Sequence, residues 1–154
     1  MVELLIYIGL LTLFLTVLTT LFVSIFKLQL TTQSTSSLTQ DTRFIIARMG
    51  YDIENAKSIS TPSSLGQITN SLTFKDSGGN TFTYALDASN NLTLNGTPIN
   101  GLDTTISNIP NITFQMIGTD ITKPTIQIKF TINSNVIEES GPRSQDIQTT
   151  YGLR

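Results

Sequence analysis

The side chains able to do chemistry in this chain are carboxylates, hydroxyls and amines, because its 154 residues include neither Cys nor His. Serine–histidine and cysteine–histidine nucleophiles, zinc sites built from thiolate or imidazole, and disulfides are therefore excluded. Carboxylate, lysine and tyrosine chemistry and oxygen-ligand metals remain. We predict no catalytic residue, no cofactor-binding residue and no metal site, and expect a protein that is not an enzyme.

Two groups of polar residues come closest to a metal site. Asp87, Ser89 and Asn91 have the first, third and fifth places of a calcium-binding loop. The Gly of the sixth place is missing, and Pro98 stands where the bidentate acid belongs, so a polar turn is favoured. Glu138 and Glu139 have no second acidic pair in the sequence to oppose them, and a solvated loop is favoured there.

One carboxylate lies in an unusual position. Glu3 directly precedes an apolar run from Leu4 to Phe26, which contains no charged residue and is followed by Lys27. A carboxylate near hydrocarbon is costly unless it is neutralised. Glu3 is therefore expected either to pair with a cation or to lie in the lipid headgroup layer, where the dipole of a helix N-terminus also favours it.

The apolar run itself predicts a membrane-spanning helix. Its 23 residues would extend about 34 Å as a helix, enough for a hydrocarbon core of about 30 Å. A secretory signal peptide is the alternative, but the basic start and the small-residue cleavage site are missing. Thr12, Thr16 and Thr20 form a row on one face, where their hydroxyls either bond to carbonyls of the same helix or meet a neighbouring helix.

A second, amphipathic helical segment is predicted beyond Lys27. Apolar residues recur at close to the helical period, most charged residues lie off that stripe, and no Pro occurs before Pro62. One helix from about Glu3 to about Ile59 is therefore expected, with residues 1–27 as its transmembrane half and residues 28–59 as its amphipathic half. Charged pairs such as Arg48 with Asp52 are interpreted as a solvated face. The stripe expected to pack against the remaining chain consists of Leu38, Ile45, Met49, Ile53 and Ala56.

Residues 60–154 show the alternation typical of strands. Segments 71–75 and 81–86 flank a Gly-rich turn, 92–94 lead into Asn95-Gly96, and 112–117, 126–132 and 149–154 are further strand candidates. The predicted fold class is α+β, a long N-terminal helix packed on a C-terminal antiparallel β-sheet domain. Thr, Ser and Asn supply 51 residues (25 + 15 + 11) and charged residues only 13 per cent, which favours a β-rich extracytoplasmic domain. The net charge is −2 without a basic cluster, so no nucleic-acid surface is evident.

Residues 1–9, MVELLIYIG, resemble the start of type IV pilins and type II secretion pseudopilins. Mature chains of that family begin with an aromatic, a small polar and two apolar residues before Glu-Leu-Leu and a long apolar helix. On this alignment two residues and a short basic leader precede Met1. Residues 38–59 are similar to the second half of the helix in J-type pseudopilins and minor pilins, and the ending TTYGLR is similar to the tail common in J-type proteins.

This resemblance implies a structural subunit of a type IV pilus or a related secretion or uptake pseudopilus, of the minor or tip type. Such a subunit is a single-pass inner-membrane protein with an extracytoplasmic C-terminus until its helix polymerises into a filament at the cell surface or across the periplasm. The implied partners are other pilin-like subunits, an inner-membrane assembly platform, membrane lipid before assembly, and a prepilin peptidase acting upstream of Met1, next to the residue that the family methylates.

In the family, the equivalent of Glu3 pairs with the N-terminal amine of an adjacent subunit. The residues expected to make subunit contacts are Glu3, Leu4, Leu5, Thr12, Thr16 and Thr20. The alternative function is a membrane-anchored extracytoplasmic β-domain that acts as an adhesion or ligand-binding module, with the helix as a tether. An anchored enzyme is the third and least favoured reading.

Overall fold

The computed structural model describes residues 2–118, 123–138 and 141–154 and confirms the α+β class. A single long helix, α1, covers Val2–Glu54 and precedes all the strands. The strands of the described chain are β1 (Ser58–Thr61), β2 (Ile68–Thr69), β3 (Leu72–Lys75), β4 (Thr81–Leu86), β5 (Leu92–Leu94), β6 (Thr97–Pro98), β7 (Thr104–Ile106), β8 (Thr113–Ile117), β9 (Thr125–Ser134) and β10 (Ser144–Gly152).

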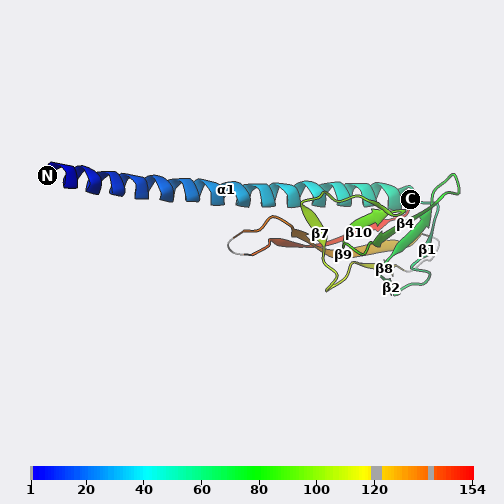
Figure 1. The fold of residues 1–154 in the computed structure, drawn as a ribbon. Coiled ribbons are helices and arrows are strands. Elements are labelled where there is room, and N and C mark those ends of the chain that lie inside the picture. The colour runs from blue at the N-terminus through cyan, green and yellow to red at the C-terminus, as the bar shows by residue number, and fades with distance from the viewer. Residues whose placement is uncertain (1, 119–122, 139–140) are drawn as a thin grey trace.

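Helix α1 is one uninterrupted rod whose N-terminal part projects far beyond the β-domain (Figure 1). Its 53 residues correspond to about 80 Å of helix. It ends at Glu54, five residues before the predicted end at Ile59. The reason is tertiary: the backbone N–H of Lys57 donates to the carbonyl of Lys75 at 2.7 Å, and the next residues pair with β3 as β1.

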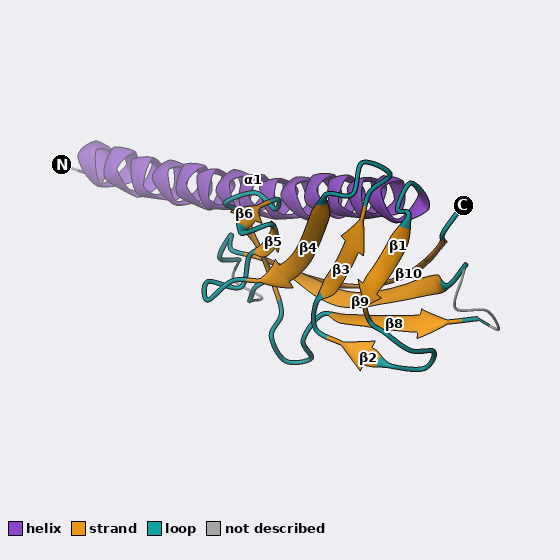
Figure 2. Cartoon of the chain, turned by 90° about the vertical axis from the view of Figure 1, so that its right-hand side faces the viewer, coloured by secondary structure: helices purple, strands orange, loops and turns teal. Residues whose placement is uncertain are grey.

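Two antiparallel sheets cover the C-terminal half of the helix (Figure 2). The first has the strand order β1-β3-β4-β5-β6, and the second has the order β10-β9-β8-β2. Strand β9, ten residues long, is the centre of the second sheet. It pairs with β10 along one edge, and with β8 and then β7 along the other.

The core lies between α1 and the inner faces of the sheets. The structure buries every residue of the predicted packing stripe: Leu38, Ile45, Met49, Ile53 and Ala56. Ala56 makes its contact from the turn after the helix. On β9, Ile126, Ile128, Phe130 and Ile132 alternate with more exposed residues and fill the core from the other side, as the period-two pattern predicts.

Polar contacts fix the C-terminal half of the helix to the domain. The Asp41 carboxylate accepts a hydrogen bond from the backbone N–H of Gly101 at 2.8 Å and another from the Thr104 hydroxyl. Near the end of the helix, the backbone N–H of Arg154 donates to the carbonyl of Glu54 at 3.4 Å. The C-terminus of the chain therefore lies beside the C-terminus of the helix (Figure 1).

Candidate functional site

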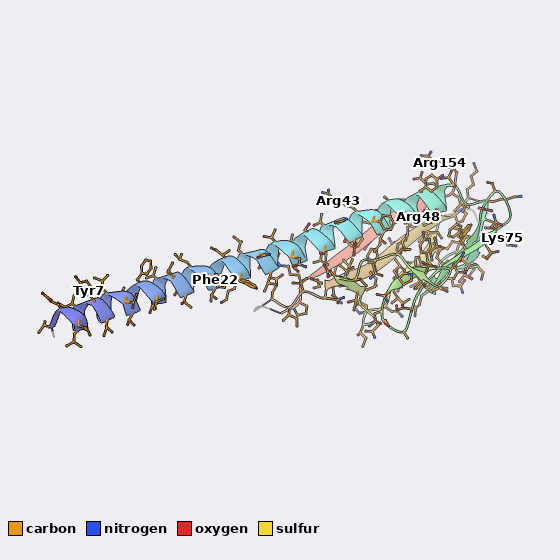
Figure 3. All side chains as sticks on the ribbon, turned by 45° about the horizontal axis from the view of Figure 1, so that its top comes forward. Tyr7, Phe22, Arg43, Arg48, Lys75 and Arg154 are labelled. Atoms are coloured by element: carbon orange, nitrogen blue, oxygen red, sulfur yellow. The ribbon has the colours of Figure 1, made fainter. Side chains whose placement is uncertain are left out.

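The feature with the greatest functional content is the projecting part of α1, residues 2–29, which we call the projecting helix. All of its residues are exposed, and Leu30 is the first that the β-domain partly covers. In Figure 3 its side chains, including the labelled Tyr7 and Phe22, radiate from the rod with no other part of the chain around them. Among the described residues this is the helix long and apolar enough to cross a membrane.

The Thr and Ser hydroxyls of the projecting helix donate hydrogen bonds within the helix itself. Thr12 donates to the carbonyl of Ile8 at 2.8 Å, and Thr16 donates to that of Thr12 at 2.8 Å. Thr19, Thr20 and Ser24 make the same bond four residues back. Because each hydroxyl hydrogen is already bonded, these side chains present a methyl group or a bare oxygen lone pair to their surroundings, which lowers the cost of placing them in an apolar medium.

The same residues form a shallow groove along one side of the rod. It is lined by Thr12, Leu15, Thr16, Thr19, Thr20, Val23, Ser24 and Lys27. Small side chains of this kind let another helix approach closely. Thr12, Thr16 and Thr20 therefore share one surface, as predicted. This surface suits a neighbouring helix because the side chains are small, and not because they have free hydroxyl donors.

Glu3, the acidic member of the predicted subunit contacts, lies at the end of α1 farthest from the β-domain. Glu3 is in the first turn of α1 and is exposed, as are Leu4 and Leu5. The first backbone N–H groups of a helix lack partners within the helix, so the positive end of its dipole favours a carboxylate there. Met1 lies outside the described residues.

Two exposed aromatic residues on the C-terminal half of α1, beyond the projecting helix, were not predicted to be part of the site. Phe44 is 52 % exposed and Tyr51 is 68 % exposed. At about 100° per residue, both lie on the face of α1 nearly opposite Ile45, Met49 and Ile53. Their spacing of seven residues is the signal that could have identified them, because it places two apolar side chains on one face.

The interpretation of Arg48 and Asp52 as a solvated pair is wrong for Asp52. The two side chains form an ion pair at 3.0 Å, but only 11 % of the Asp52 side chain is exposed. Its carboxylate also accepts a hydrogen bond from the buried Tyr84 hydroxyl at 2.6 Å. Burial, reinforced by the negative charge of Asp52, raises the pKa of Tyr84 well above its usual value.

The interpretation of residue 138 as part of a solvated loop is also wrong. Glu138 is 8 % exposed, forms an ion pair with Arg143 at 3.1 Å, and accepts a hydrogen bond from Thr31 at 3.2 Å. Glu138, which follows β9, is thereby in contact with the helix through Thr31. Desolvation opposes its ionisation, but the Ser34 hydroxyl, Arg143 and Thr31 outweigh it, and the pKa of Glu138 is lowered. Glu139 lies outside the described residues.

In the candidate calcium loop, the Asp87 carboxylate is occupied by hydrogen bonds from the loop itself. The Asp87 carboxylate accepts hydrogen bonds from the backbone N–H groups of Ser89 and Asn91 and from the Asn91 side chain, all at 2.8 to 2.9 Å. These bonds, led by those from Asn91, lower the pKa of Asp87. In the described part of the chain, no group of three acidic side chains is placed to hold a metal ion.

Comparison of the chain with models of protein families, with curated proteins and with solved structures finds no match. The features of the molecule that bear on function are therefore the helix and its exposed surfaces.

Proposed function

We propose that this chain is a pilin-like structural subunit. Its projecting helix anchors it in a membrane, and the chain is then incorporated into a helical filament. The exposed apolar surface of residues 2–29 needs lipid or other apolar helices around it, because such a continuous surface is not stable in water. Lipid supplies that environment before assembly, and sister helices supply it afterwards. The resemblance of residues 1–9 to pilins points to the same role.

The observation that carries the proposal is the position of Phe44 and Tyr51. A helix that only anchors a binding module needs an apolar surface as far as the membrane extends. Here the exposed apolar run ends at Leu28, and two further exposed aromatic side chains, Phe44 and Tyr51, form a second apolar part of the α1 surface next to the β-domain. A filament in which helices pack side by side would bury both parts of that surface, and the β-domains would form its exterior.

Glu3 provides the direct test. The chain is expressed in cells that assemble the filament, and its amount in sheared high-molecular-weight filaments is compared with its amount in membranes. We expect the Glu3→Ala variant to remain in membranes and to be depleted from the sheared fraction, because the apolar helix loses the carboxylate that pairs with a neighbouring cation.

Glu54→Ala is the matched control, since it removes a partly exposed acid from the other end of the same helix, where the partner is Arg154 at 3.4 Å. It should assemble like the wild type. If the wild-type chain stays with membranes, or reaches the medium only after loss of the apolar helix, the tethered-module function replaces the filament function.

A further inference from the structure

The outer edge of β10 is the one long sheet edge that the described part of the fold leaves open. Strand β10 is nine residues long and pairs in continuous register with β9 on one side, while the strand order places it at the end of its sheet. Exposed edges of this kind present unpaired N–H and C=O groups to other chains, and proteins usually protect them.

The other edge strands of the described chain have such protection. Strand β1 has four residues and an irregular register between Ile59 and Thr61. Strands β2 and β6 have two residues each, with Pro98 in β6, and β7 has three. Strand β10 contains no Pro, no Lys and no bulge, and its one charged residue is Asp146.

The register identifies the backbone groups that are open. The carbonyl of Arg143 accepts from the N–H of Ser134, and the N–H of Leu153 donates to the carbonyl of Pro124. In an antiparallel ladder, every second residue directs both backbone groups to the same side. Odd-numbered residues of β10 therefore face β9. The even-numbered residues direct their N–H and C=O groups outward and are all exposed: Ser144, Asp146, Gln148, Thr150 and Gly152.

We propose that this edge pairs with the same edge of a second copy of the chain, in an antiparallel register centred on Gln148. In this register Ser144 lies opposite Gly152 of the second copy, and Asp146 lies opposite Thr150. Each outward-facing residue thus meets another outward-facing residue, and the ladder is complete over the whole strand. The two Asp146 carboxylates are four residues apart along the ladder, about 14 Å, so like charges do not oppose each other.

The proposed β10 pair would join two chains whose projecting helices point in opposite directions. Strand β10 runs alongside α1 in the same direction, since Arg143 contacts Thr35 at 3.1 Å, Tyr151 contacts Ile46 at 2.9 Å and Arg154 contacts Glu54 at 3.4 Å. An antiparallel β10 pair therefore sends the two projecting helices in opposite directions. It links chains held in two opposed membranes or in two filaments of opposite direction, and it is separate from packing within one filament.

A single engineered thiol tests the register, because the chain has no cysteine of its own. In the full-length Gln148→Cys variant in detergent, the two thiols face each other across the symmetry axis. Directly paired Cα atoms in such a ladder are about 5.5 Å apart, which is within the range that a disulfide spans. We expect a disulfide-linked dimer under mild oxidation.

Ser144→Cys is the matched control on the same face of the same strand, because its two copies would be about 27 Å apart. It should remain monomeric alone but form a heterodimer when mixed with Gly152→Cys. Equal cross-linking of Ser144→Cys and Gln148→Cys, or no cross-linking of Gln148→Cys, would overturn the proposal. The cross-link is measured on dispersed chains, so its failure is distinguishable from a failure of filament assembly.

Discussion

The ring of Tyr151 covers the Cα atom of Gly50 so closely that a Cβ atom at position 50 would lie 2.6 Å from the ring. The hydroxyl of the same tyrosine donates to the carbonyl of Ile46 at 2.9 Å. The next-to-last turn of the helix is therefore fastened to the last strand of the sheet, and a glycine in the helix interior is needed for that contact.

Replacing Gly50 by Ala should destabilise the protein. The added methyl group forces the Tyr151 ring to move, and overpacking of this kind typically costs about 1 to 3 kcal/mol. The measurement is the thermal unfolding of the purified chain in detergent, followed by circular dichroism. Gly9→Ala is the matched control, because nothing lies within 4 Å of a Cβ atom there; a loss of stability in both variants would contradict the explanation.

Tyr84→Phe should also destabilise the protein, and it should change the response to alkaline pH. The phenol donates to the Asp52 carboxylate, and loss of a hydrogen bond to a charged group costs about 2 kcal/mol. Because the folded-state pKa of Tyr84 is raised, its contribution is present below the usual pKa of about 10 and is lost as the pH rises above it.

Unfolding measured from pH 8 to 11 should therefore show a steeper loss of stability for the wild type than for Tyr84→Phe. Tyr51→Phe removes the hydroxyl of an exposed tyrosine on the helix that carries Asp52 and should behave like the wild type. Identical alkaline slopes for wild type and Tyr84→Phe would rule out this role for Tyr84.

Glu138→Gln should remove part of the sensitivity of the protein to acid. The pKa of Glu138 is lowered in the folded chain, so its stabilising contribution is present above the usual carboxyl value of about 4.3 and is lost as the pH falls through the lowered value. Thermal unfolding between pH 6 and pH 3 should be less steep in the variant. An unchanged acid response would show that the ionised Glu138 carboxylate does not help to hold its contact with Thr31 of the helix.

Substitutions at Thr16 can separate the size of the side chain from its hydrogen bond. The hydroxyl already donates to the carbonyl of Thr12, so the proposed helix packing needs a small side chain more than it needs the hydroxyl. We expect Thr16→Val to assemble into filaments and Thr16→Phe to be depleted from them. Equal loss in both variants would assign the hydroxyl an intersubunit bond.

Phe44→Ser should reduce filament yield while leaving the β-domain folded. Burial of a Phe side chain contributes about 1.5 to 3 kcal/mol, and Phe44 is half exposed in the single chain. Filament yield and thermal unfolding are measured on the same preparations. Leu102→Ser, which replaces an apolar residue that is 98 % exposed on a loop, is the control; equal yields for the two variants would remove Phe44 from the assembly surface.

The sequence predicted the features that depend on long repeating patterns. The helix and its buried stripe follow from apolar spacing and the absence of Pro, and β3, β4, β8 and β9 follow from alternation. Strands β1, β2 and β7 have only two to four residues, too few for a pattern, and they form because β3, β8 and β9 offer them backbone partners.

The errors in polar residues have a different physical cause. Asp52 and Glu138 are charged, and a charged side chain is by itself expected to be exposed. Their partners Tyr84 and Thr31 are 32 and 107 residues away, so only the folded chain reveals their burial. Phe44 and Tyr51 were overlooked because the buried stripe alone accounted for the amphipathic pattern.

The continuous helix has a mechanical consequence. No Pro interrupts α1 between the apolar end and the β-domain, and Asp41, Tyr151 and Arg154 attach the domain at successive levels of the rod. A pulling force applied at the apolar end therefore loads the contacts between the helix and the β-domain in shear. The load is shared among several attachments, because the helix has no hinge that could bend first.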